Sequence, residues 1–173
     1  MVDSAHPRRR LREQLDVCGV PQPRWLVCAP DEDLAAFAAR IDDELGWPCV
    51  LAPRRGPVVR VDEPEDLAAR LALTERPVLA EAFVPGGEVA FEGIVAGGRL
   101  EARALLDRPD APQDGARPTQ LPAAAQAQVL AITQLAVRAL GLGDGPVHAV
   151  LRLPHDCCAG TELPVVIDVA SPR

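Results

Sequence analysis

The sequence predicts an α+β fold built from two lobes, and three observations lead to this expectation. Segments with helical spacing of apolar residues dominate the chain up to residue 73. Strand-like runs separated by glycine turns follow Pro77. One long helical segment then precedes two final strands, and this order is typical of an α+β protein. We place the lobes at residues 1–79 and 80–173, and we expect a mainly antiparallel sheet in the second.

The first lobe is expected to combine three helices with a short β-hairpin. Each helical segment places apolar residues three and four positions apart, and two of the segments end at a glycine. The third begins with acidic residues and a proline, which favour a helix start. The expected helices span residues 8–19, 31–46 and 62–73. Strands at 47–53 and 57–61 flank the turn 54–56.

The second lobe is expected to be a sheet with one long helix at residues 123–143. The segment before this helix, 107–122, is rich in proline, aspartate and glycine and is interpreted as a loop. Apolar runs between turn residues indicate the strands. The expected strands span residues 78–84, 88–95, 99–106, 146–153 and 163–170.

Composition limits the classes of function. The chain has 25 acidic residues against 18 basic ones, all of them arginine, and this balance argues against nucleic-acid binding. The basic run at residues 8–12 is interpreted as a solvated helix start. No segment approaches the roughly 18 apolar residues of a membrane span, and no apolar region of a signal peptide follows the start. We therefore expect a cytoplasmic protein without a membrane partner.

The five cysteines are scattered and odd in number, which does not indicate a disulfide framework. We expect reduced thiols that act as small apolar side chains. Cys157 and Cys158 lie beside His155 and Asp156, and these four residues are the alternative, a metal site. Adjacent cysteines do not readily reach one tetrahedral zinc together, so we favour the first interpretation.

The last two expected strands bring polar residues to one surface. In a strand, His148 and Arg152 face the same side, and a hairpin with the last strand would place Asp168 near them. A single carboxylate holds Mg²⁺ when phosphate oxygens complete the coordination. The alternative is a cross-strand ion pair between Arg152 and Asp168.

A second candidate site lies around the reversal of the chain after residue 81. Glu81 and Glu88 bracket this reversal, and Phe83 and Val84 offer apolar surface for a flat heteroaromatic ring. Glu88 would accept hydrogen bonds from sugar hydroxyls. The alternative is a hairpin flanked by two solvated glutamates. A P-loop is excluded, because its lysine is missing from a chain without lysine.

Several segments, taken in order, resemble the ATP-grasp superfamily, most closely its carboxylate–amine ligase branch. The segments are "LDVCGVPQPRW", "ELGWPCVLAPRRG", "VLAEAFVPGGEVAFEGIVAGGRL", "LLDRPDAPQDG", "ALGLGDGPVHAVLR" and "VVIDVA". The resemblance begins at about Arg8 and runs to the end of the sequence. It implies a truncated ATP-grasp chain that lacks the upstream domain of the family.

The resemblance implies that ATP binds in a cleft between two α+β lobes and that Mg²⁺ accompanies it. Such enzymes use ATP to turn a small carboxylate into an acyl-phosphate, which an amine then attacks. By position, Glu81, Ala82, Phe83 and Val84 correspond to the adenine hinge and Glu88 to the ribose acceptor.

The sequence departs from the family pattern at the phosphate and metal positions. Ala52 stands where the family has a phosphate-binding lysine, and Val150 stands where it has a metal-binding glutamate. Asp168 replaces the second metal-binding glutamate and is the one metal ligand that we assign. Arg54 and Arg55, in the shortened glycine loop, are candidates to grip phosphate in place of lysine.

These departures leave two classes of function open, and we assign no catalytic residue. The first is an ATP-binding protein derived from an ATP-dependent carboxylate–amine ligase, which is either active by itself or completed by a partner protein. The second is a non-catalytic interaction or regulatory module with the same fold that does not bind nucleotide. Because several charge-neutralising groups are absent together, we expect a pseudoenzyme.

Overall fold

The structure is a computed structural model, and two compact units divide the chain between them. The described residues are 6–72, 76–108, 117–154 and 162–171. The first unit comprises residues 1–12 and 23–83, and the second comprises residues 13–22 and 84–173. This division differs from the expected lobes in two respects. The first unit ends at Phe83 rather than at residue 79, and residues 13–22 belong to the second unit. Helix α1 (Pro7–Val17) includes residues of both units.

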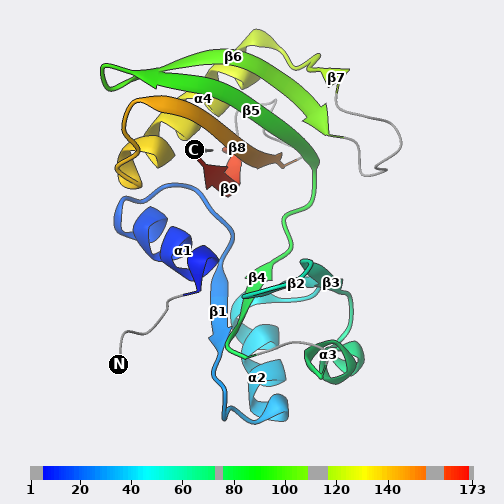
Figure 1. The fold of residues 1–173 in the computed structure, drawn as a ribbon. Coiled ribbons are helices and arrows are strands. Elements are labelled where there is room, and N and C mark those ends of the chain that lie inside the picture. Colours follow the sequence, from blue (N-terminus) through cyan, green and yellow to red (C-terminus); the bar gives the residue numbers. More distant parts are fainter. Residues whose placement is uncertain (1–5, 73–75, 109–116, 155–161, 172–173) are drawn as a thin grey trace. The chain divides into compact units, whose positions relative to one another are not determined.

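The first unit is built on a four-stranded antiparallel sheet in the order β1-β4-β2-β3 (Figure 1). Its strands are β1 (Trp25–Cys28), β2 (Cys49–Pro53), β3 (Val59–Val61) and β4 (Val78–Ala82). Its helices are α2 (Leu34–Arg40), the π-helix η1 (Ile41–Leu45) and α3 (Pro64–Leu71). The three helices expected in the first lobe are therefore present, as α1, as α2 with η1, and as α3. The expected hairpin is formed by β2 and β3.

One face of this sheet forms the core of the first unit. Side chains of alternate strand positions pack against α2, η1 and α3. The core residues are Leu26, Cys28, Phe37, Ile41, Leu45, Cys49, Leu51, Val61, Leu67, Leu71, Val78 and Ala80. The residues between them along β2 and β4, Val50 and Glu81 among them, therefore face the opposite side of the sheet.

Strand β1 was not expected from the sequence. It is only four residues long, and prolines at positions 23 and 30 lie close to both of its ends. Short apolar runs between prolines match a loop as well as a strand. The pairing of Trp25 with Glu81 and of Cys28 with Val78 makes it an edge strand of the sheet.

The second unit is a five-stranded antiparallel sheet in the order β7-β6-β5-β8-β9 with one helix. Its elements are β5 (Gly87–Ala96), β6 (Arg99–Arg108), β7 (Arg117–Pro118), α4 (Ala123–Ala139), β8 (Gly145–Leu153) and β9 (Val165–Ala170). The antiparallel sheet and the β8–β9 hairpin confirm the expected arrangement. The short strand β7 lies in the segment expected to be a loop, and residues 109–116 of that segment lie outside the described residues.

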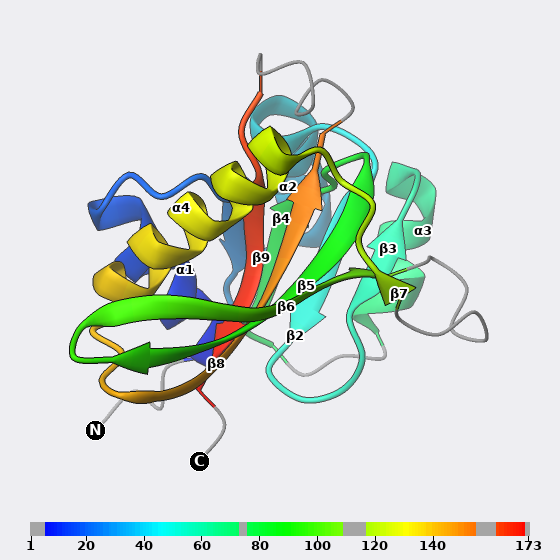
Figure 2. The ribbon, with the colours of Figure 1, turned by 90° about the horizontal axis from the view of Figure 1, so that it is seen from above.

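Helix α4 covers one face of this sheet, as the view in Figure 2 shows. Its buried residues include Val129, Ile132 and Ala136, and the sheet contributes Phe91 and Leu151. None of the described helices combines the length and the apolar character needed to cross a membrane.

The edge strand β9 is contacted by the segment 13–22. The backbone N–H of Val166 donates a hydrogen bond to the carbonyl oxygen of Pro21 at 2.9 Å. This contact is one reason why residues 13–22 belong to the second unit. The cysteine pair at 157 and 158, with His155 and Asp156, lies outside the described residues.

The turn between β4 and β5 gives a first testable prediction. Gly86 has a φ of +119°, and a Cβ atom there would lie 2.8 Å from the carbonyl carbon of Leu153. Neighbouring Gly87 has open space at the same position. We expect Gly86→Ala to lower the free energy of unfolding by about 1–3 kcal/mol or more, because it adds backbone strain and a backbone clash.

Denaturant unfolding of Gly86→Ala beside Gly87→Ala measures this effect. The Gly87 variant is the matched control and is expected to stay within about 1 kcal/mol of the wild type. Equal stability of the two variants would show that the turn tolerates a side chain at residue 86.

Candidate functional site

A buried ionic cluster lies on the strand that leads into the expected hinge. Glu81, in β4, is 2% exposed, and Arg12 of α1 is fully buried. Nε and Nη2 of Arg12 donate to the two carboxylate oxygens of Glu81 at 2.8 and 3.1 Å. Arg8 makes the same pair of hydrogen bonds at 2.8 and 2.9 Å. Two bidentate contacts on one carboxylate fix the start of the chain to β4.

The two arginines keep the Glu81 carboxylate charged. Burial alone would raise the pKa of this group, but the hydrogen bonds from Arg8 and Arg12 and their positive charges outweigh it. The pKa of Glu81 therefore lies below its ordinary value of 4.5. Two expectations are wrong here, because the basic run at residues 8–12 is not simply solvated and Glu81 is not a solvated glutamate.

Two backbone donors of the expected hinge are already engaged. The N–H of Ala82 donates to the carbonyl oxygen of Arg24 at 2.9 Å, and the N–H of Phe83 donates to that of Pro48 at 3.2 Å. A base at this segment would therefore use other groups than these two N–H donors. The ring of Phe83 is covered by Arg60 of β3, whose Cζ atom lies 4.2 Å from the ring centroid. Val84, the last expected hinge residue, belongs to the second unit and begins the longer of its two segments, residues 84–173.

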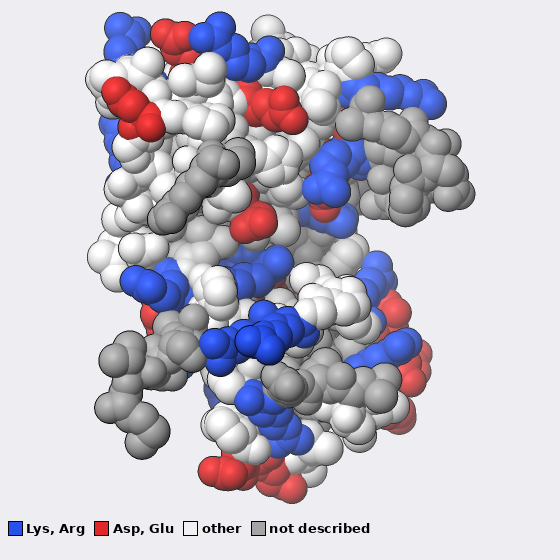
Figure 3. Space-filling model, viewed as in Figure 1, with Lys and Arg blue, Asp and Glu red and all other residues white. Residues whose placement is uncertain are grey.

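The expected phosphate positions of the first unit differ in exposure. Ala52 is 1% exposed, and Nε2 of His6 lies 3.0 Å from its carbonyl oxygen. Arg54 and Arg55 are exposed in the turn between β2 and β3, and neither has a hydrogen bond or ion pair to any described residue. On the surface that Figure 3 draws, arginine side chains (blue) are interspersed with carboxylates (red). The turn arginines are thus available to an anion, whereas position 52 is not.

Glu88 lies in a row of charged side chains across three strands of the second unit. Its cross-strand partners are Arg108 on β6 and Arg152 on β8. The Oε1 atom is 3.0 Å from Nη1 of Arg108, and the Oε2 atom is 3.4 Å from Nη2 of Arg152. Arg152 also donates to the carbonyl oxygen of Gly86 at 3.1 Å. Each oxygen of Glu88 therefore has one arginine partner.

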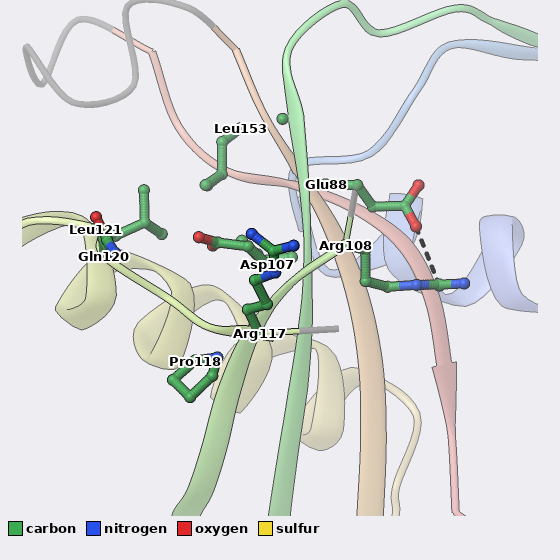
Figure 4. A pocket seen from close by; sticks show the side chains of 10 residues that line it. Glu88, Asp107, Arg108, Arg117, Pro118, Gln120, Leu121 and Leu153 are labelled. Atoms are coloured by element: carbon green, nitrogen blue, oxygen red, sulfur yellow. Dashed lines mark ion pairs between the residues drawn. The ribbon is translucent and has the colours of Figure 1, made fainter. Parts of the chain in front are cut away.

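A pocket of about 490 Å³ opens beside Glu88 (Figure 4). Polar and apolar side chains of the second unit line it, namely Glu88, Asp107, Arg108, Arg117, Gln120, Leu121 and Leu153 together with Gly87, Val89 and Pro118. Its volume is in the range of small-molecule sites. In Figure 4 the ion pair of Glu88 and Arg108 lies on one side of this group and Gln120 and Leu121 on the other.

The expected metal ligand, Asp168, lies in the β8–β9 hairpin directly opposite Val150, which stands where the family has its other metal-binding residue. Val150 pairs with Asp168, so their side chains share one face of the sheet. The Asp168 carboxylate is exposed and accepts a hydrogen bond from the N–H of Val169 at 3.0 Å. The alternative ion pair with Arg152 does not form, since Arg152 pairs with Glu88 across the sheet. Among the described residues, no group of three or more histidine, cysteine or acidic side chains is arranged to hold a metal.

The cysteines of the described residues do not form a nucleophile site. Cys28 and Cys49 are buried free thiols in the core of the first unit, and Cys18 is exposed. Burial raises the pKa of the Cys49 thiol to about 12, so it stays protonated at neutral pH. The two buried thiols act as small apolar side chains, as expected.

Known proteins resemble this chain both in sequence and in structure. The sequence matches no model of a known protein family. A D-alanine–D-alanine ligase of Methylibium petroleiphilum is 32% identical over 157 residues, covering 78% of this chain and 49% of that ligase. The chain thus spans about half the length of this relative.

Two solved structures carry the comparison of folds. An L-amino acid ligase from Bacillus licheniformis has a TM-score of 0.72 and 27% identity, over 94% of this chain and 39% of that protein. A D-alanine–D-alanine ligase from Bacillus anthracis, complexed with ATP, has a TM-score of 0.77 and 18% identity, over 96% of this chain and 53% of that protein. The chain belongs to the ATP-grasp superfamily, and the expected α+β ATP-grasp fold is confirmed.

The sequence did not reveal the arginines that contact the expected site residues. Arg8, Arg12, Arg60, Arg108 and Arg152 each touch an expected site residue in the structure. Helical spacing was the one signal available, since Arg8 and Arg12 lie four apart and so share a helix face. Their common partner is about seventy residues away, and no local pattern reports such a distance.

Replacing Glu81 tests the importance of the buried ionic cluster. We expect Glu81→Gln to lower the free energy of unfolding by about 3–5 kcal/mol, because it leaves the buried Arg12 guanidinium without a charged partner. Denaturant unfolding at neutral pH measures the change. Glu101→Gln is the control, since Glu101 pairs with Arg103 at 3.3 Å on the surface and its loss should cost less than about 1 kcal/mol. Similar effects of the two variants would contradict a special role for Glu81.

The same cluster predicts an acid-sensitive part of the stability. Since the pKa of Glu81 is lower in the folded state, its contribution is complete above the ordinary pKa of this group and is lost as pH falls through the folded value. The stability difference between wild type and Glu81→Gln should therefore shrink as pH falls below about 4. Urea unfolding from pH 7 to pH 3 measures this difference, and a constant difference would contradict the assignment.

Proposed function

We propose that this chain binds ATP through the segment after β4 and through Glu88, and that it does not catalyse ligation on its own. The observation that carries the proposal is the direct pairing of Val150 with Asp168. The resemblance assigns a metal-binding carboxylate to each of these positions, and one of the two is apolar here. The metal site that the resemblance implies is thus reduced to one carboxylate, and this is why we propose no ligation by the chain alone.

The environment of Glu88 suits a ribose acceptor. An ionised carboxylate has about four acceptor positions, and the two arginine contacts leave room for others. Those contacts also hold the side chain in one orientation, which lowers the entropic cost of binding. Glu88 therefore accepts hydrogen bonds from sugar hydroxyls without giving up its partners.

The residues present do not suit a pair of magnesium ions. Asp168 is exposed and supplies one carboxylate, which serves for one Mg²⁺ that keeps its waters and phosphate oxygens. When bound, such an ion neutralises phosphate charge. Arg54 and Arg55 add positive charge at the β2–β3 turn for the same purpose. The ATP complex of the Bacillus anthracis ligase supports nucleotide as the ligand class.

The relatives suggest what an active assembly would do. The D-alanine–D-alanine ligase and the L-amino acid ligase point to a small carboxylate as the substrate that ATP activates. In this chain such a reaction requires a partner protein that supplies the missing charge-neutralising groups. If no nucleotide binds to the chain, the alternative function holds, namely a module of the same fold that does not bind nucleotide.

Thermal unfolding with Mg-ATP tests the proposed binding. Saturating Mg-ATP should raise the unfolding temperature by several degrees, since a ligand at one hundred times its Kd adds about 2.7 kcal/mol. Glu88→Ala should weaken this shift, because it removes the acceptor for the sugar. Glu92→Ala, an exposed acid farther along β5, is the control and should leave the shift unchanged. The absence of any shift at millimolar Mg-ATP would overturn the proposal.

Restoring the missing carboxylate gives a gain-of-function test. Val150→Glu should increase the Mg²⁺-dependent affinity for ATP by about ten-fold or more, because a second charge beside Asp168 attracts the ion. Calorimetric titration with ATP, with and without Mg²⁺, measures this. The double variant with Asp168→Ala is the control and should lose the gain. If the affinity for ATP did not depend on Mg²⁺ in either variant, residues 150 and 168 would not be the magnesium site.

A further inference from the structure

Arg60 and Phe83 form a stacked pair on the first unit. Arg60 belongs to β3, and its Cζ atom lies 4.2 Å from the centroid of the Phe83 ring. A guanidinium at this distance over an aromatic ring is held by a cation–π interaction. The pair places a planar cation directly on the residue that the resemblance assigns to the adenine hinge.

A carboxylate fixes the orientation of this guanidinium and balances its charge. Both Nε and Nη2 of Arg60 lie 2.7 Å from Oδ1 of Asp62. The Arg60 side chain still keeps 49% of its surface exposed. The result is a guanidinium that is held in place, is nearly neutral together with Asp62, and is partly open to solvent.

The register of the sheet puts this surface on the same side as the ionic cluster. Arg60 pairs with Val50, and Val50 pairs with Glu81, so the three side chains form one row across the sheet. This side is opposite to the apolar core of the first unit. Phe83, two residues after Glu81, continues the same side.

Phosphate is a poorer partner for Arg60 than a base. Asp62 already neutralises the guanidinium, and its carboxylate repels a second anion. Arg54, the candidate phosphate contact, follows the last residue of β2, whereas Val50, the partner of Arg60, lies near the start of that strand. The two arginines therefore lie at different places along the hairpin, and one nucleotide has its base and its phosphates at opposite ends.

We propose that Arg60, stacked on Phe83, is the residue on which the base of the bound nucleotide stacks, and that it determines the preference for a base-bearing ligand. Guanidinium planes stack on nucleobases, and stacking tolerates different bases because each has a π face. The inference rests on the proposed nucleotide binding and adds a residue outside the expected hinge.

Two ligands separate this role from a phosphate contact. Calorimetric titration of the full chain uses Mg-ATP and inorganic tripolyphosphate with Mg²⁺. We expect Arg60→Ala to weaken Mg-ATP binding by about 5- to 100-fold and to leave tripolyphosphate binding unchanged. Arg60→Lys should behave similarly, since lysine keeps the charge but has no planar group.

Arg103 supplies a matched control. It pairs with Glu101, two residues away on its strand, just as Arg60 pairs with Asp62, and it is comparably exposed. Arg103→Ala should leave the affinities for both ligands unchanged. The thermal midpoints of all variants without ligand show whether a loss of affinity comes from a loss of folded protein.

Each other outcome has a separate meaning. If Arg60→Ala weakened the binding of both ligands equally, Arg60 would be a phosphate contact and the inference would be wrong. If the variant bound Mg-ATP more tightly, the Arg60 side chain would occupy the place of the base, and the inference would again be wrong. Unchanged Mg-ATP affinity in a folded Arg60→Ala protein would overturn the inference alone. Failure of the wild type to bind Mg-ATP would overturn the proposed function and the inference with it.

Discussion

The contact of Glu81 with Arg8 and Arg12 is the interaction on which the arrangement of the first unit depends. An ionised carboxylate with almost no exposed surface is stable only if hydrogen bonds replace its water. Here two guanidiniums from the same helix provide four of them. Because Glu81 lies on β4, between β1 and β2 in the sheet, the cluster couples α1 to the strand that ends at Ala82.

The same unit shows a sheet of this fold without the lysine that the family has at position 52. Position 52 is apolar and buried, and the cations on that side of the sheet come instead from α1 and β3. In the second unit, Val150 and Asp168 are cross-strand partners, and only one of them carries a charge. The fold of the family is thus present, while these positions differ from the residues that the resemblance would place there.

The sequence was sufficient for elements whose pattern is local. Helical spacing located the helices, and strand alternation with the expected hairpin placed Asp168 on the strand that pairs with the strand of His148 and Arg152. The features that the sequence did not predict are interactions between residues that are far apart in the chain. The burial of Arg12, for example, depends on a glutamate 69 positions away. The four-residue strand β1 was missed because its pairing with β4, rather than its own residues, makes it a strand. The expected site residues were identified by resemblance, and their arginine partners required the structure.

The hydrogen bond between Val166 and Pro21 has a consequence for the behaviour of the protein at high concentration. Strand β9 is an edge of its sheet, and open edges invite pairing between molecules. Pro21 accepts a hydrogen bond from that edge but has no N–H of its own to offer. A second chain that approached this point of the edge would therefore meet a residue that cannot continue the ladder.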